Sequence, residues 1–115
     1  MASELATLDA TAQAEMVRRG EASAVELVQA AIESIEKLNP LLNAVVTPTF
    51  ERALAAARDR QDGPLHGVPY LVKDLITEVA GVRFTEGSVF LRDNVSTFDS
   101  ELVVRLRRAG LIILG

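Results

Sequence analysis

Hydrophobic residues near the start of the chain recur at the spacing of an amphipathic helix. This periodicity runs from Leu8 to Arg19 and predicts a helix over that range. Asp9 is a candidate N-cap because its side chain can accept a backbone hydrogen bond, and Gly20 stands where glycine commonly ends a helix. We therefore expect a first helix with a recognisable boundary at each end.

A second helix is predicted to begin directly after Ser23. Ser23 and Glu26 have the spacing of a capping box, in which each side chain accepts a hydrogen bond from the backbone N–H of the other residue. Asn39-Pro40 predicts the end, because proline disfavours the helical conformation of the residue before it. The apolar stripe between these signals, expected to pack in the core or against a partner, consists of Leu27, Val28, Ala31, Ile32, Ile35 and Leu38.

The rest of the chain alternates short apolar runs with helical periodicity. Such alternation is typical of an α/β fold, and we expect helices packed on a mixed β-sheet. From 76 to 97 the pattern is irregular, and loops of this length are usually functional or disordered. The predicted elements are strands at 43–47, 68–73 and 111–114, a turn at 61–64, and helices at 50–57 and 98–109, the last capped by Thr97 or Asp99 with Leu102, Val103 and Leu106 facing inward.

Composition removes several classes of function. The 115 residues carry a net charge of −4 and no cluster of basic and aromatic side chains, so nothing favours nucleic-acid binding. With no cysteine and one histidine, disulfides and thiolate or multi-histidine metal sites are excluded within this sequence. That histidine, His66, stands in a turn and is expected to bond backbone. Neither a secretory signal nor a bilayer-length apolar run is present, so we expect a cytoplasmic protein.

The last predicted strand, at 111–114, is followed only by Gly115. An uninterrupted apolar strand is normally buried on both faces of a parallel sheet, and α/β proteins bind their ligands in the loops that follow such strands. Three short strands and four helices hardly supply that cover. We therefore expect these residues to form the front part of a longer protein.

Lys73 is the one charged side chain in the run 68–73. Alternation along a strand would place it beside Pro69 and Leu71, where apolar surroundings disfavour the charged ammonium form. A neutral lysine can take a proton from a hydroxyl, as activation of a serine nucleophile requires, whereas arginine stays charged. The alternative is an ion pair with Asp74 or contact with water. We expect Asp74 to point the other way and to accept hydrogen bonds from nearby backbone amides.

The motifs from Gly63 onward resemble the sequence pattern of the amidase signature family. They are GPLHGVPYLVKD from Gly63 to Asp74, then Thr85-Glu86-Gly87-Ser88, then a helix begun at Asp99 and ended by Ala109-Gly110, then the apolar strand and Gly115. The resemblance implies the α/β fold of that family and hydrolysis of amide bonds without a metal or cofactor. It also implies a triad of a nucleophilic serine, a second serine that bridges through a cis peptide, and a lysine, which matches Lys73.

The resemblance implies further assignments along the chain. Residues 1–115 would be the N-terminal portion of a single amidase domain, with a helical segment at 1–40 and an α/β segment at 41–115 that carries the lysine strand. Both serines of the triad lie downstream in the family and no Gly-Gly-Ser-Ser-like motif occurs here, so this segment alone is expected to be inactive. The residues expected to line the substrate pocket, in a loop that approaches the active site in the family, are Thr85, Gly87 and Ser88.

Two alternatives to a general amidase stay open. The stretch 84–88 departs from the commoner Thr-Thr-x-Gly-Ser form, and is more similar to general amidases that hydrolyse cyclic and linear amide oligomers. It is less similar to the glutaminase subunit of the tRNA-dependent amidotransferases, which would work with partner subunits. A non-catalytic binding module is the other alternative, which the uncovered strand at 111–114 disfavours. The expected partners are a small-molecule amide and the rest of the chain's own protein, with a homodimer as a candidate assembly and no nucleic acid or membrane.

Overall fold

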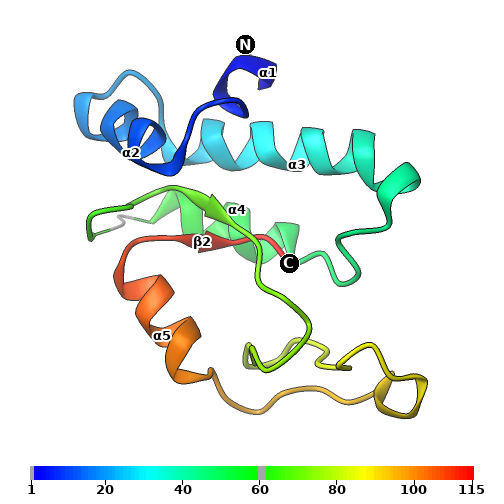
Figure 1. The fold of residues 1–115 in the computed structure, drawn as a ribbon. Coiled ribbons are helices and arrows are strands. Elements are labelled where there is room, and N and C mark those ends of the chain that lie inside the picture. The colour runs from blue at the N-terminus through cyan, green and yellow to red at the C-terminus, as the bar shows by residue number, and fades with distance from the viewer. Residues whose placement is uncertain (1, 60–61) are drawn as a thin grey trace.

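The computed structural model describes residues 2–59 and 62–115, whose helices gather around one short parallel sheet (Figure 1). The long helix α3 contacts α1, α4 and β1, and in Figure 1 it lies above the strands, with α5 below them. The elements are α1 (Ala2–Leu5), α2 (Ala10–Arg19), α3 (Ala24–Leu42), α4 (Phe50–Arg58), β1 (Pro69–Tyr70), the 3-10 helix η1 (Val89–Leu91), α5 (Glu101–Arg108) and β2 (Ile112–Ile113). This arrangement confirms the predicted α/β class for the described residues.

The two strands run parallel, with Pro69 opposite Ile112 and Tyr70 opposite Ile113. Their backbone pairing extends past the strand ends, because the amide of Leu114 donates to the carbonyl of Tyr70 (2.9 Å) and the amide of Val72 donates to that of Gly115 (3.0 Å). The carboxyl-terminal end of β1 is therefore held beside Gly115.

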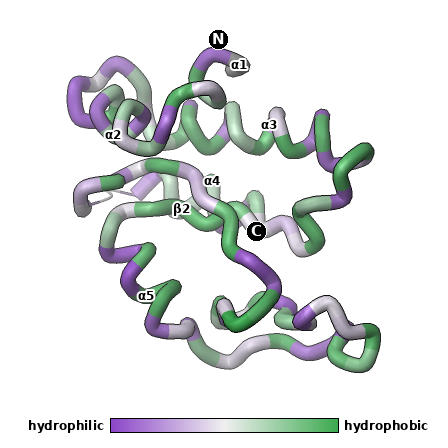
Figure 2. The backbone as a smooth tube through the Cα atoms, viewed as in Figure 1, coloured by the Kyte–Doolittle hydropathy of each residue, from purple (hydrophilic) through white to green (hydrophobic). Residues whose placement is uncertain are grey.

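The main core lies between α3, α4 and β2. Its buried members are Val28, Ile32, Ala53, Ala57, Ile112 and Leu114. A second cluster of Ala14, Val68 and Leu111 joins α2 to the starts of the strands. Figure 2 shows β2 as a hydrophobic stretch of the chain, which matches its place in this core. The strands are thus short, but the burial of β2 in this core fixes where the chain leaves the sheet.

Both predicted N-caps are confirmed, although the first of these helices, α2, begins at Ala10 and not at Leu8 as predicted. The Asp9 side chain accepts from the amide of Ala12 (2.8 Å), and the Ser23 hydroxyl accepts from the amide of Glu26 (3.2 Å). In return the Glu26 carboxylate accepts from the backbone N–H and the hydroxyl of Ser23, which completes the capping box. These two hydrogen bonds hold the pKa of the Glu26 carboxyl below its ordinary value. Gly20 ends α2 in the left-handed conformation, as predicted.

The predicted end of the second helix and the strand at 43–47 are both wrong. α3 continues through Pro40 to Leu42, because the effect of a proline on the residue before it is a preference and not a prohibition. The Asn39 side chain then accepts from the amide of Val45 and donates to its carbonyl, both at 2.9 Å. These bonds occupy the backbone groups that a strand would need. Leu38, expected on the apolar stripe, is 49% exposed.

Other boundaries also differ from the prediction. Helix α5 begins after Ser100 rather than at 98, and neither Thr97 nor Asp99 is its N-cap. Leu102 on this helix is exposed, whereas Val103 is buried as expected. The strands predicted at 68–73 and 111–114 shrink to their central residues, and α1 was not predicted. The predicted turn at 61–64 begins at Gln61, which lies outside the described residues.

Gly110 lets the turn before β2 approach the turn before β1. Its φ is 95°, and an added Cβ would lie 2.4 Å from the Cα of His66 and 2.6 Å from the carbonyl oxygen of Asp62. The amide of Gly67 donates to the carbonyl of Gly110 (2.9 Å), and the amide of Leu65 donates to that of Ala109 (2.8 Å). This backbone contact aligns the starts of the two strands.

We expect Gly110→Ala to destabilise the protein much more than Gly20→Ala. Both glycines have positive φ, so alanine carries a backbone penalty of roughly 1–2 kcal/mol at either position. At Gly20 an added Cβ meets nothing within 4 Å, whereas at Gly110 it meets backbone and adds about 1–3 kcal/mol of overpacking. Denaturant midpoints of the two variants measure the difference. Equal shifts would contradict the prediction, because they would show that the backbone around Gly110 can move to accommodate a Cβ without further cost.

Candidate active site

A pocket opens where the chain leaves the sheet, at the carboxyl-terminal end of the strand pair. It has a volume of about 500 Å³, and Gly115 and Val72 line it beside the loop residues. Ligands of α/β proteins bind at this end of parallel strands. The site residues predicted from the sequence all line this pocket, and they are Lys73, Thr85, Gly87 and Ser88. Their chemical roles in it stay predictions.

Lys73 lies beyond β1 rather than within it. The strand ends at Tyr70, and the Lys73 side chain is exposed, as is the neighbouring Leu71. The predicted burial of Lys73 on an apolar strand face is therefore wrong for the described part of the chain. Lys73 forms no hydrogen bond or ion pair with any of residues 2–59 or 62–115, so its amine is available to a group brought into the pocket.

Asp74 does not pair with Lys73. Its Oδ1 accepts from the backbone amide of Thr85 (2.7 Å) and at 3.4 Å from that of Glu86, while its Oδ2 accepts from the Thr85 hydroxyl. The expectation that Asp74 caps backbone amides is confirmed, and the alternative of an ion pair with Lys73 is wrong in this structure. One carboxylate thus joins the segment that follows β1 to a turn that begins eleven residues later in the chain.

The turn Thr85 to Ser88 is held in an uncommon backbone conformation. Glu86 has φ 51° and Gly87 has φ 71°, and the amide of Ser88 donates to the carbonyl of Thr85 (2.9 Å). Two central residues of positive φ define a type I′ turn, and a non-glycine residue there costs roughly 1–2 kcal/mol. The Thr85 hydroxyl also accepts from the amide of Gly87 (3.3 Å). Glycine adopts positive φ readily, whereas Glu86 adopts it against the preference of its side chain.

The long loop expected from the sequence is irregular but tied at several points. Phe84 and Asn94 exchange hydrogen bonds, with the Phe84 amide donating to the Asn94 carbonyl (2.9 Å) and the Asn94 side chain donating back (2.8 Å). The Ser96 hydroxyl donates to Glu78 (2.9 Å). Asp99, expected only as a cap, accepts from the amide of Ala80 (2.8 Å) and pairs with an arginine of α5. The loop is therefore anchored on both sides of the 85–88 turn.

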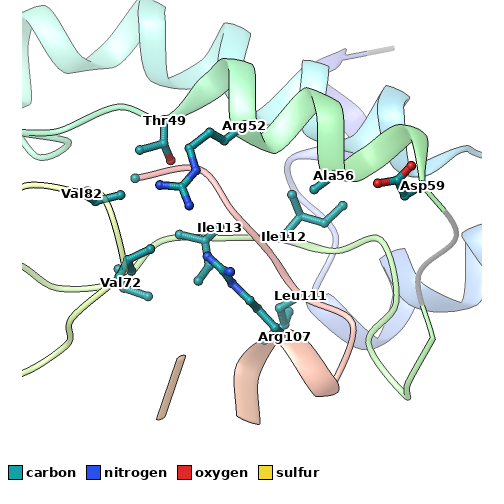
Figure 3. Close-up of a pocket in the computed structure, with 12 residues that line it drawn as sticks. Thr49, Arg52, Ala56, Asp59, Val72, Val82, Arg107, Leu111, Ile112 and Ile113 are labelled. Carbon is teal, nitrogen blue, oxygen red and sulfur yellow. The ribbon is translucent and has the colours of Figure 1, made fainter. Parts of the chain in front are cut away.

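A second pocket lies against β2 and shares Val72 in its lining with the pocket of Lys73 (Figure 3). It has a volume of about 440 Å³ and an apolar wall of Leu111, Ile112 and Ile113. Figure 3 shows Arg52 and Arg107 reaching into it from α4 and α5. Arg52 donates to the carbonyl of Ala80 (3.1 Å), and Arg107 lies 3.3 Å from a carboxylate oxygen of Asp99. Both guanidinium groups thus hold the long loop, and none of the predicted site residues lines this pocket.

Other candidate chemistry can be placed. The ring Nδ1 of His66 lies 3.2 Å from the carbonyl oxygen of Gly63, which confirms its expected contact with backbone. Across residues 2–59 and 62–115, no group of acidic or histidine side chains is arranged to hold a metal ion. Within those same ranges, no helix combines the length and the apolar character needed to cross a membrane.

The pocket at Lys73 offers one amine and a turn with a free hydroxyl-bearing side chain. The Thr85 hydroxyl is engaged by Asp74, and Ser88 is exposed with no histidine lining the pocket beside it. A nucleophile is recognised by a hydrogen bond to its base, and the described residues show none between Lys73 and a hydroxyl. The pocket therefore contains Lys73 as a candidate base, and the 85–88 turn forms part of its wall.

A family model described as Amidase matches residues 26–115. The chain is 41% identical over 109 residues to the 6-aminohexanoate-cyclic-dimer hydrolase of Pseudomonas sp. (strain NK87), which covers 93% of this chain and 22% of that protein. It is also 41% identical over 120 residues to a Glutamyl-tRNA(Gln) amidotransferase subunit of Salinispora tropica, covering 97% of this chain and 24% of that protein. The two identities are equal and do not separate a general amidase from a glutaminase subunit.

The fold agrees with the sequence comparison. A solved structure of 6-aminohexanoate cyclic dimer hydrolase complexed with substrate matches 94% of this chain and 23% of its own length, with a TM-score of 0.88 and 41% identity. The chain therefore spans less than a quarter of the length of each of these three proteins. With a family match over residues 26–115 and a shared fold, the chain belongs to the amidase signature family.

Proposed function

We propose that this chain is the N-terminal portion of a serine hydrolase that cleaves carboxylic amide C–N bonds, with Lys73 as the lysine of a Ser-cisSer-Lys triad. One observation carries the proposal: Lys73 lines the pocket at the end of the strands while the adjacent Asp74 carboxylate is bound to Thr85. A lysine without an ion-pair partner among the described residues can form a hydrogen bond with a hydroxyl from another part of the protein. The family membership and the relatives named as amide hydrolases support the same reading.

The chemistry follows from the amine of Lys73. In the complete enzyme Lys73 takes a proton from the bridging serine, which in turn takes one from the nucleophilic serine. The nucleophile attacks the amide carbon, the amine or ammonia leaves with a returned proton, and water then hydrolyses the acyl-enzyme. Both serines belong to segments outside these 115 residues. Arginine cannot replace Lys73, since it does not release its proton in proteins.

The finer assignments belong to the same proposal. Residues 1–115 form the N-terminal portion of one amidase domain, in which 1–40 is a helical segment and 41–115 the α/β segment with Lys73. The strand pair becomes part of a mixed sheet when further strands join it. The protein is cytoplasmic and acts on a small-molecule amide. The residues that line the substrate are Thr85, Gly87 and Ser88, because they share the pocket of Lys73.

The glutaminase subunit of a tRNA-dependent amidotransferase is the second candidate. It is supported by a relative of that name with the same 41% identity as the cyclic-dimer hydrolase. The chemistry at Lys73 would be the same, with glutamine as the amide and ammonia passed to a partner subunit. Release of ammonia from glutamine by the full-length protein favours this candidate, and turnover of other amides without it favours a general amidase.

We expect Lys73→Ala and Lys73→Arg in the full-length protein to lower kcat by about 10²–10⁴-fold, because proton transfer by a positioned base contributes about that factor. The matched control is Lys37→Ala. Lys37 is the only other lysine in the sequence and is exposed on α3, away from the pocket. Steady-state hydrolysis of a set of simple amides measures the effect. Retention of full activity by Lys73→Ala would remove Lys73 from the mechanism.

The 115-residue chain by itself is expected to hydrolyse neither amides nor esters, since it supplies only the lysine of the triad. The purified segment and the full-length protein are compared on the same chromogenic amide and ester. Hydrolysis by the segment that disappears in its Lys73→Ala variant would contradict this expectation, because it would require a complete catalytic unit within these residues.

A further inference from the structure

We propose that Asp74 is a positioning residue that holds the 85–88 turn against the segment that follows β1. This contact preserves the shape of the pocket and keeps the Asp74 carboxylate from pairing with the Lys73 amine. This role rests on the proposed function of Lys73. The contact between Asp74 and Thr85 would support the reaction by positioning the residues that line the pocket.

The contact between Asp74 and Thr85 consists of several hydrogen bonds to one carboxylate and is partly buried, unlike a typical surface hydrogen bond. Asp74 accepts from the amide and the hydroxyl of Thr85 and, at 3.4 Å, from the amide of Glu86. Thr85 is only 6% exposed, so its polar groups have little access to water. Charge-assisted hydrogen bonds of this kind are the strong ones. A single carboxylate thus satisfies most of the polar groups at the start of the turn.

These hydrogen bonds to Asp74 also account for the strained backbone of the turn. Glu86 adopts a left-handed conformation that a side chain disfavours, and its amide points at the Asp74 carboxylate. Strained conformations persist where surrounding contacts over-determine them, and they gather at functional sites. The Thr85 hydroxyl then receives the amide of Gly87, so the order imposed by Asp74 reaches the residues that line the pocket.

The same hydrogen bonds determine whether Lys73 can form an ion pair with Asp74. An aspartate next to a lysine is its nearest available counter-ion, yet both carboxylate oxygens of Asp74 already accept hydrogen bonds from the turn. Freeing Asp74 from Thr85 would return that carboxylate to the lysine and let the turn relax. Catalysis would suffer through both changes, since displacement of catalytic groups by about 1 Å can cost about 100-fold.

A double-mutant cycle in the full-length enzyme tests this inference. Asp74→Ala and Thr85→Val are each expected to lower kcat by about 10–100-fold, from the loss of hydrogen bonds to a charged group. If the two residues act as one unit, the double variant falls no more than about 3-fold below the worse single variant. Losses that multiply in the double variant would overturn the inference.

Two further variants separate positioning from a loss of folding. Thr85→Ser keeps the hydroxyl and is expected to restore kcat to within about 3-fold of the wild type, whereas Thr85→Val does not. Glu86→Gly removes the backbone strain, so in the Asp74→Ala background it is expected to recover at least about 3-fold of the lost kcat. Failure of both rescues, with the variants folded by their unfolding midpoints, would overturn the inference.

Matched controls lie in the same loop. Asp93→Ala removes an aspartate whose side chain is 95% exposed, and Thr97→Val removes an exposed threonine hydroxyl. Both are expected to leave kcat within about 2-fold of the wild type, as surface substitutions generally do. Lys73→Ala in the same series separates the two claims. If it is inactive while Asp74→Ala and Thr85→Val stay active, only the positioning role fails. If Lys73→Ala is active, the proposed function itself fails.

Discussion

The parallel pairing of β1 with β2 is the constraint on which the site depends. It brings together two segments some forty residues apart, and its last bonds hold Val72 beside Gly115. The pairing is possible because α3 and α4 bury the Ile112 side and because Gly110 lets the two preceding turns touch. Once the ladder ends, the next residue of the chain is Lys73, which therefore leaves the sheet at a defined place.

The position of Lys73 would be of little use if its nearest carboxylate neutralised it. Asp74 lies in the turn that begins after Lys73, and its carboxylate is not paired with the lysine. Thr85 then offers that carboxylate an amide and a hydroxyl in a site nearly closed to water. A preorganised set of neutral donors thus competes successfully with an exposed ammonium group, whose interaction with a carboxylate in water is weak. The outcome is a Lys73 amine that lines the pocket and has no partner among residues 2–59 and 62–115.

Local signals in the sequence were sufficient for several of these features. Asp9, the Ser23–Glu26 box and Gly20 act within one turn of their helix, so their roles could be predicted without knowledge of the fold. Features set by contacts between distant residues could not. Asp74 was expected to cap amides, but nothing near it indicated Thr85 as the partner. The burial of Lys73 was wrong because alternation was extended past Tyr70, where the strand ends. Thr85 to Ser88 could be found as candidates only through the family resemblance, since turns carry little periodicity.

The role proposed for Lys73 is that of proton acceptor for a serine pair contributed by the rest of the protein. A crystal structure of the full-length enzyme would give the distance from the Lys73 amine to the nearest serine hydroxyl. We expect a hydrogen bond of about 2.6–3.2 Å to a serine that in turn contacts a second serine, with Asp74 still bound to Thr85. A Lys73 amine paired with Asp74, or with no serine in reach, would contradict it.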